Sequence, residues 1–163
     1  MKKIFLLTLT LFSLHLAAQK SVEEVQSKKL NGTRQIMISL PPSYEKEPDR
    51  KFPLLFLLDG EYLFDAFSGA LSYANYWDDL PQVIIVGISQ NANGERFIDS
   101  QFNPETGVPE EGGAKFYDFI VSELIPALEK KYRIAPFKVI AGHDTTAGFL
   151  NFFLYKDLSL IHI

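Results

Sequence analysis

The chain has 163 residues, a length that allows one domain with a sizeable hydrophobic core but leaves little room for a second. It has 16 Lys and Arg against 20 Asp and Glu, and this balance argues against a nucleic-acid binder, which usually carries a basic surface. The absence of Cys excludes disulfides, thiolate metal sites and cysteine nucleophiles. Only three histidines are available for catalysis: His15, His143 and His162.

The first 18 residues have the pattern of a secretory signal peptide. Lys2 and Lys3 precede an apolar run over residues 4–16, and Ala17-Ala18 offers a small-residue cleavage site. The apolar run is too short for a helix that spans a bilayer. We therefore expect a secreted or periplasmic protein, with no membrane span after cleavage of residues 1–18.

Several apolar segments have the lengths and patterns of strands. Residues 19–33 are polar and are expected to form a loose lead-in to the domain. Residues 34–40 alternate between apolar and polar side chains, which predicts a half-buried strand. Residues 53–58, 83–88 and 137–142 are short and almost continuously apolar, which is typical of strands buried on both faces.

Helical spacing of apolar residues appears between and after these strands. It predicts helices over residues 61–73, 114–132 and 147–155, and Pro126 is expected to kink the second of them. Residues 89–113 are rich in Asn, Gly, Pro and Glu and predict a long loop. Alternating strands and helices favour an α/β fold with a mostly parallel sheet, whose functional site lies at the carboxyl ends of the strands.

Residues 142–146 predict a tight turn between a buried strand and a helix. Such a turn is the setting of a nucleophile elbow, which lifts one side chain above the edge of the sheet. The lifted position here is Asp144, and the backbone N–H of Thr145 would face the oxygen of a reacting carbonyl group. The backbone N–H groups of Gly60 and Glu61, after an earlier strand, are candidates for a second donor in an oxyanion hole.

Motifs spread over residues 34–156 resemble those of a known family. They are Ile38-Ser39-Leu40-Pro41-Pro42-Ser43-Tyr44, Leu57-Leu58-Asp59-Gly60, Ile85-Val86-Gly87-Ile88, Asn93-Gly94-Glu95-Arg96 with Asp99, Glu123-Leu124-Ile125-Pro126, and Ala141-Gly142-His143. In this order the chain resembles the "Putative esterase" family of α/β-hydrolases, which includes enterochelin-type and esterase-D-type enzymes. The resemblance implies, over residues 34–163, the N-terminal part of a three-layer α/β-hydrolase fold. It also implies carboxyl-ester substrates and no metal or organic cofactor.

The chain departs from the family's pattern in two ways. The family's elbow carries Ser where this chain has Asp144, and Gly where it has Thr146. The family's catalytic acid and histidine lie well downstream of the elbow, whereas this chain continues only to Ile163. We therefore expect a degenerate nucleophile position, an incomplete sheet and a truncated or frame-shifted chain. His143 is interpreted as a packing residue beneath the elbow rather than as the catalytic base.

Two further functions stay open. Gly142-His143-Asp144 also resembles the elbow of haloalkane dehalogenases and epoxide hydrolases, in which Asp is the nucleophile, although those families place an aromatic residue where this chain has Thr145. The second open function is that of a pseudoenzyme, a non-catalytic module that binds a small ester-like ligand. Four aromatic residues after the first buried strand could line its pocket, although aromatic residues also fill cores: Tyr62, Phe64, Tyr76 and Trp77.

The loop near the site contains Arg96 and Asp99, which either contact the substrate or pair with each other to pin the loop. The sequence contains no Gly-rich phosphate loop, no H-E-x-x-H motif and no dinucleotide-binding fingerprint, so neither a nucleotide nor a metal is expected. The substrate and the oligomeric state are left open.

Overall fold

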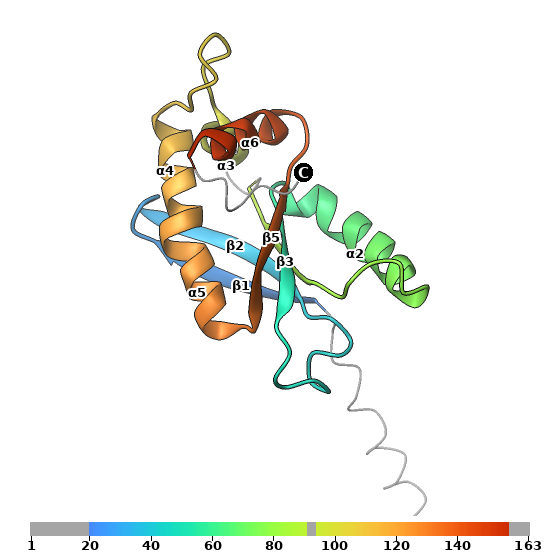
Figure 1. The fold of residues 1–163 in the computed structure, drawn as a ribbon. Coiled ribbons are helices and arrows are strands. Elements are labelled where there is room, and N and C mark those ends of the chain that lie inside the picture. The colour runs from blue at the N-terminus through green and yellow to red at the C-terminus, as the bar shows by residue number, and fades with distance from the viewer. Residues whose placement is uncertain (1–19, 91–93, 157–163) are drawn as a thin grey trace, which may run out of the picture.

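The computed structural model describes residues 20–90 and 94–156, and five of its strands form one sheet in the order β1-β2-β4-β3-β5 (Figure 1). The strands are β1 (Lys20–Ser27), β2 (Gly32–Ser39), β3 (Phe52–Leu57), β4 (Ile84–Ile88) and β5 (Ile134–Ala141). The helices are α2 (Gly60–Tyr76), α3 (Glu95–Ser100), α4 (Glu111–Phe119), η2 (Ile120–Leu124), α5 (Ile125–Lys131) and α6 (Thr145–Lys156). The expected signal peptide and His162 lie outside the described residues.

The sheet is mixed. β3 runs parallel to both β4 and β5, as the alternation of strands and helices predicts, whereas β2 pairs antiparallel with β1 and β4. Residues 20–27 differ from the expected loose lead-in, because they form the edge strand β1 along the whole of β2. Most of β1 is exposed and polar, and among its apolar residues only Val25 packs against the core, so the strand lacks a clear hydrophobic pattern.

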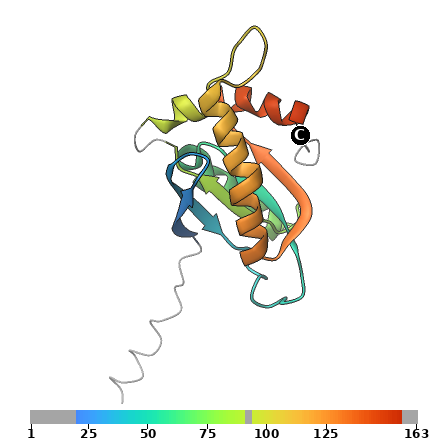
Figure 2. The ribbon, with the colours of Figure 1, turned by 90° about the vertical axis from the view of Figure 1, so that its left-hand side faces the viewer.

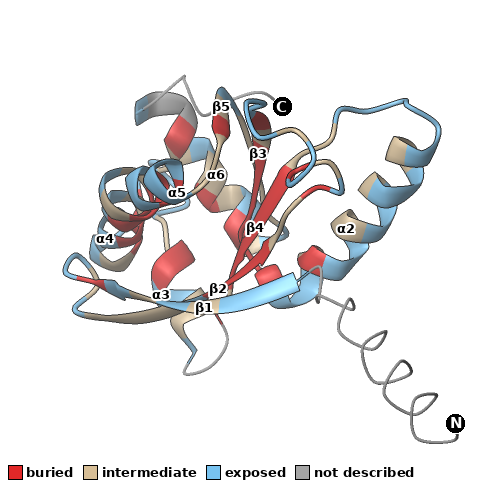
Figure 3. Cartoon of the chain, turned by 90° about the horizontal axis from the view of Figure 1, so that it is seen from below, coloured by how far each residue is buried: buried red, intermediate tan, exposed pale blue. Residues whose placement is uncertain are grey.

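Helices cover both faces of the sheet, so the fold has three layers (Figures 1 and 3). On one face, α2 inserts Phe64 among Met37, Leu55, Leu57 and Ile85. On the other face, α4, η2, α5 and α6 pack against residues that include Leu54, Phe56 and Val86. Successive residues of β3 therefore enter opposite cores, which confirms the prediction of a strand buried on both faces.

The predicted helix over residues 114–132 is present, and it begins earlier, at Glu111. Figure 2 shows α4, η2 and α5 as one continuous rod along this face of the sheet. A π-helical segment, η2, comes directly before Pro126, which lies in the first turn of α5. Instead of the expected kink at Pro126, the helix has a widened turn ahead of the proline (Figure 2), where the proline ring would otherwise clash with the preceding turn.

The widened turn η2 also contains Glu123, which holds the β1–β2 hairpin. Ser27 Oγ donates a hydrogen bond to Glu123 Oε2 at 2.5 Å, and the backbone N–H groups of Lys28 and Lys29 donate to Oε1 at 3.2 and 3.3 Å. Lys131 on α5 donates to the Glu23 carboxylate at 2.7 Å and thereby lowers the pKa of Glu23. Edge strand β1 is therefore tied to the helical layer at two places.

None of the described helices is long and apolar enough to cross a membrane.

The start of α2 lies unusually close to β4. A Cβ atom on Gly60 would lie 2.8 Å from the carbonyl oxygen of Ile88 and 2.9 Å from the carbonyl carbon of Gly87. Both of these are backbone atoms, so a side chain at Gly60 cannot be accommodated by a rotamer change. The glycine therefore allows the N-terminus of α2 to lie against the carboxyl end of the sheet.

We predict that Gly60→Ala lowers the free energy of unfolding by about 1–3 kcal/mol, because the added methyl group forces α2 away from β4. Gly69→Ala on the same helix is the control, since a Cβ there meets nothing within 4 Å. That substitution should raise the stability by about 0.5–1 kcal/mol through helix propensity alone. Urea denaturation of the two variants measures both effects, and equal stabilities would contradict the close approach of Gly60 to β4.

Candidate active site

Two left-handed residues mark the carboxyl ends of neighbouring strands. Asp59 follows β3 with φ 54°, and Asp144 follows β5 with φ 55°. Asp is among the residues that tolerate this region best. Each residue is followed at once by a helix, α2 or α6, and β3 and β5 are hydrogen-bonded neighbours. The tight turn predicted at residues 142–146 is therefore present. The N-termini of α2 and α6 lie at the same edge of the sheet.

The carboxylate of Asp59 is fully buried and joins three segments of the chain. Arg96 Nε donates to Oδ1 at 2.6 Å and Arg96 Nη2 to Oδ2 at 3.1 Å. Thr146 Oγ1 donates to Oδ2 at 2.7 Å, and the Asp59 N–H donates to Gln90 Oε1 at 3.1 Å. The hydrogen bond to Asp59 raises the pKa of Arg96, so the guanidinium stays charged. A buried carboxylate is tolerated only with such partners.

Thr146 links this carboxylate to the elbow. Besides donating to Asp59, its Oγ1 accepts a hydrogen bond from the His143 N–H at 2.8 Å. A Cβ atom on Gly142 would lie 2.7 Å from Thr146 Oγ1, so the glycine provides the space for this hydroxyl group. Thr146 is completely buried. At the position where the resembling family has Gly, the threonine therefore ties the first turn of α6 to the end of β3.

Asp144 lies at the tip of the elbow, with its side chain 69% exposed. Its Oδ2 atom is 3.8 Å from Arg96 Nη2, which also donates to the carbonyl oxygen of His143 at 3.0 Å. A hollow of about 400 Å³ lies beside it and is lined by Tyr62, Leu63, Arg96, His143 and Asp144. The interpretation of His143 as a packing residue is wrong: its side chain is exposed, because Thr146 occupies the space beneath the turn.

Of the two alternatives for Arg96 and Asp99, the pairing of these residues with each other is wrong. Arg96 binds Asp59, whereas Asp99 accepts two hydrogen bonds from Arg34 on β2, at 3.1 and 2.8 Å. Burial raises the pKa of Asp99, and the hydrogen bond from Arg34 opposes that shift. Both residues lie on α3, a helix within the segment 89–113 for which the sequence predicts a long loop. Two ion pairs thus fix α3, one to β2 and one to the end of β3, and only Arg96 reaches the hollow.

The three candidate oxyanion-hole donors lie in the first turns of two helices. Gly60 and Glu61 begin α2, and Thr145 begins α6. N–H groups in a first helical turn have no acceptor within their own helix, and the helix dipole adds positive potential there. The Glu61 carboxylate accepts hydrogen bonds from the Ser89 hydroxyl group and from the Gln90 N–H, the latter at 2.9 Å. That these N–H groups donate hydrogen bonds to the carbonyl oxygen of a ligand stays a prediction.

A metal centre requires several ligand side chains clustered around one point. Within residues 20–90 and 94–156, no three carboxylate or imidazole side chains are grouped so that they could hold a metal ion.

Comparison with known families decides the lineage. The model of the Esterase family, described as "Putative esterase", matches residues 27–149. The chain belongs to this esterase family. Its mixed five-stranded sheet and flanking helices (Figure 3) agree with the partial α/β-hydrolase fold that the sequence resemblance implies.

Solved structures share this fold. An uncharacterised protein from Capnocytophaga ochracea is 24% identical with a TM-score of 0.78, over 87% of this chain and 38% of that one. An IroE-like serine hydrolase from Shewanella oneidensis is 30% identical with a TM-score of 0.74, over 86% of this chain and 48% of that one. Ferric enterobactin esterase from Salmonella typhimurium is 19% identical with a TM-score of 0.67, over 84% of this chain and 33% of that one. The chain thus spans less than half the length of each. The search of curated proteins found no match.

Sequence reasoning missed the shared partners of the site. Asp59 belongs to the motif Leu57-Leu58-Asp59-Gly60, but its links to Arg96 and Thr146 cross 37 and 87 positions of the chain. Nothing in the local sequence indicates the role of Gln90, which is fully buried. The one local signal for a buried, paired carboxylate is an Asp directly after a fully apolar strand.

We predict that Thr146→Val lowers the free energy of unfolding by about 1–3 kcal/mol, because a valine of similar shape leaves Asp59 Oδ2 and the His143 N–H each short of a partner. Thr146→Ser is the matched control, since it keeps the hydroxyl group and removes only a methyl group. Its cost should stay near 1 kcal/mol, the usual value for a single buried methyl group. Thermal denaturation compares the two variants, and a valine variant as stable as the serine variant would contradict the bridging role of Thr146.

Proposed function

We propose that this chain provides the ester-binding part of an α/β-hydrolase site. The observation that carries the proposal is the left-handed Asp144 at the tip of the turn between β5 and α6, beside a hollow of about 400 Å³. In the proposed complex, the ester carbonyl oxygen accepts hydrogen bonds from the N–H of Thr145 and from that of Gly60 or Glu61. Membership of the esterase family supports carboxyl esters as the ligand class.

The chemistry of Asp144 favours binding over turnover of carboxyl esters. If its carboxylate attacked the ester carbonyl carbon, the product would be a mixed anhydride and the leaving group an alkoxide or a phenolate. Both are more basic and therefore poorer leaving groups than the attacking carboxylate, so the tetrahedral intermediate returns to the starting ester. Serine avoids this problem, because an acyl-serine is itself an ester. We therefore expect no acyl-enzyme at Asp144.

The exposed carboxylate of Asp144 favours one alternative, an Asp-nucleophile hydrolase. A carboxylate can attack a saturated carbon, displace a halide or open an epoxide, and leave an alkyl ester on Asp144. That reaction requires an accessible Asp144 beside the hollow, and Asp144 is 69% exposed and lines the hollow. The close Arg96 would stabilise the carboxylate and reduce its nucleophilicity, which makes ester binding the better-supported function.

The ester-binding proposal predicts that the full chain binds p-nitrophenyl butyrate without releasing p-nitrophenolate faster than buffer does. Saturation-transfer NMR measures binding, and absorbance measures release. Tyr62→Ala removes a ring from the hollow and should weaken binding by about 3–10-fold, the range expected for loss of one aromatic contact. Tyr73→Ala is the control, because Tyr73 is similarly exposed but lies toward the other end of α2.

The possible results separate the alternatives. Ester binding that Tyr62→Ala weakens and Tyr73→Ala does not would support the proposal. Turnover that is lost in Asp144→Asn would contradict a site that only binds. A covalent adduct on Asp144 after incubation with 1-bromobutane, seen by mass spectrometry, would establish the Asp-nucleophile reaction instead. An ester that does not bind would overturn the ester-binding function, and the absence of any adduct or turnover with 1-bromobutane would overturn the Asp-nucleophile reaction.

We also propose that the protein is exported and that residues 1–18 are removed. Support comes from Lys2, Lys3 and the apolar run that ends before Ala17-Ala18. The intact mass of the protein recovered from outside the cytoplasm of its host should correspond to a chain that starts at Gln19. Leu9→Arg should block export by breaking the apolar run. Cytoplasmic protein that keeps Met1 would refute the proposal.

A further inference from the structure

A second hollow lies at the opposite end of α2 from Asp144. Its volume is about 300 Å³, and it lies between the second half of α2, the segment after β2 and the start of β4. Because α2 has 17 residues and a helix rises about 1.5 Å per residue, the two ends of α2 are about 25 Å apart. A ligand bound here would not touch the elbow. We call this hollow, together with the exposed rings beside it, the aromatic groove.

The hollow has an uncharged lining, half of whose residues are apolar: Leu40, Pro41, Pro42, Leu71, Val83 and Ile85. No charged residue lines it within the part of the chain that the structure describes. Its polar groups are hydroxyl and amide groups, contributed by Ser39, Ser68, Ser72, Asn75, Tyr76 and Gln82. A site of this composition offers hydrogen bonds to neutral polar ligands and no counter-charge for ions.

The two amide side chains are held in fixed orientations. Gln82 Oε1 accepts a hydrogen bond from the Ser43 N–H at 3.1 Å, so its nitrogen is the end left to serve as a donor to a ligand. Asn75 Nδ2 donates to the carbonyl oxygen of Leu71 at 2.7 Å, so its oxygen is the end left to serve as an acceptor. A donor and an acceptor that are both fixed by the protein suit a ligand with neighbouring hydroxyl groups, each of which both donates and accepts.

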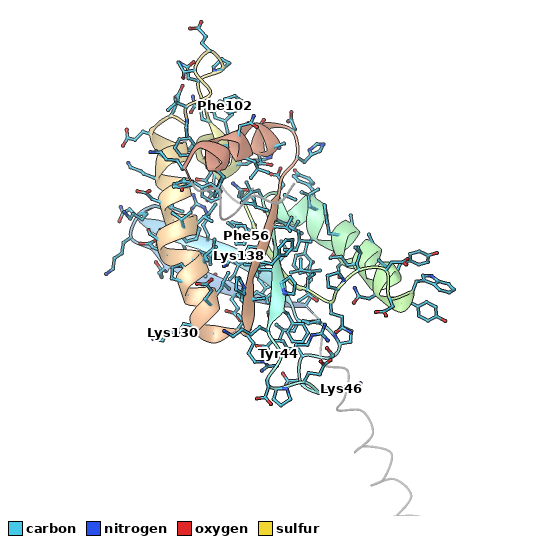
Figure 4. The ribbon with its side chains drawn as sticks, viewed as in Figure 1. Tyr44, Lys46, Phe56, Phe102, Lys130 and Lys138 are labelled. Atoms are coloured by element: carbon cyan, nitrogen blue, oxygen red, sulfur yellow. The ribbon has the colours of Figure 1, made fainter. Side chains whose placement is uncertain are left out.

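Of three exposed rings at this end of α2, Tyr76 lines the hollow, and Trp77 and Tyr73 lie beside it through ring contacts. Tyr73, Tyr76 and Trp77 are 70%, 79% and 59% exposed. The ring of Trp77 makes edge-to-face contacts with both tyrosines, at centroid distances of 6.5 and 5.1 Å. Figure 4 shows ring side chains projecting from this end of α2, away from the sheet. Exposed rings that brace one another present fixed apolar faces at low conformational cost.

We propose that the aromatic groove binds a neutral saccharide. A sugar ring has an apolar face of C–H groups that suits the exposed aromatic rings, and a rim of hydroxyl groups that suits the amide and hydroxyl groups of the lining. The uncharged lining disfavours uronic acids, phosphates and cations, which would lose hydration without gaining a counter-charge. The ligand is therefore an uncharged oligosaccharide, and the groove anchors the protein to it without taking part in chemistry at Asp144.

The chain reports on this site directly, because Trp77 is its only tryptophan. The full chain is titrated with cellohexaose, xylohexaose, mannohexaose and maltohexaose, and with hexagalacturonic acid as the charged counterpart. We expect at least one neutral hexasaccharide to change the Trp77 emission saturably and the charged one to leave it unchanged. Isothermal titration calorimetry then measures the variants, since Trp77→Ala removes the fluorescent group.

Trp77→Ala and Gln82→Ala should each weaken saccharide binding by about 10-fold, because each removes either a ring face or a fixed donor. Phe97→Ala is the matched control: Phe97 is 70% exposed and lies on α3, away from the aromatic groove, so affinity should not change. Circular dichroism melting curves confirm that the variants fold.

Three results would overturn the proposal. The first is that no neutral hexasaccharide binds to the full chain. The second is that binding persists unchanged in both Trp77→Ala and Gln82→Ala. The third is a dimer in analytical ultracentrifugation that Trp77→Ala dissociates, which would assign the rings to contact between two copies of the chain. Ester binding at the elbow is measured separately, so the failure of one proposal leaves the other standing.

Discussion

The buried carboxylate of Asp59 is the interaction on which the geometry of this site depends. It lies at the end of β3 with no exposure to solvent and accepts hydrogen bonds from Arg96 on α3 and Thr146 on α6. Moving a carboxylate out of water is costly unless its oxygens are paired, so the three segments must meet at this point. Because Arg96 also binds the carbonyl oxygen of His143, the same charge fixes the turn that presents Asp144.

This constraint explains how the elbow keeps its shape although two of its family residues have changed. The backbone at Asp144 is left-handed, a conformation that Asp tolerates better than most residues. Thr146 fits because Gly142 leaves room for its hydroxyl group, and that hydroxyl group becomes part of the Asp59 network. The turn is thus held by its own hydrogen bonds, and its tip carries an exposed carboxylate. In the function proposed above, this carboxylate allows a carboxyl ester to bind but forms no acyl-enzyme.

The helix α2 joins two regions of different chemical character. Its N-terminus is held against β4 by the absence of a side chain at Gly60, and it contributes N–H groups to the edge that contains Asp144. Its C-terminal end carries the braced rings of Tyr76 and Trp77 beside a hollow lined by apolar and uncharged polar residues. The first region combines charges and helix dipoles, which suits a polarised carbonyl group. The second combines ring faces with neutral donors and acceptors, which suits a hydroxylated ring.

The sequence by itself determined the α/β class, the buried strands β3 and β4, the helix ending near Lys131 and the turn at Asp144, because local periodicity and turn chemistry specify these. It also indicated the esterase family, through motifs that keep their order along the chain. Only the tertiary structure decided that residues 20–27 form an edge strand, since their pairing with β2 relies on backbone hydrogen bonds rather than an apolar pattern. Likewise, the partners of Arg96 and Asp99 come from β2, β3 and α6, and contacts between such distant positions leave no local signal in a single sequence.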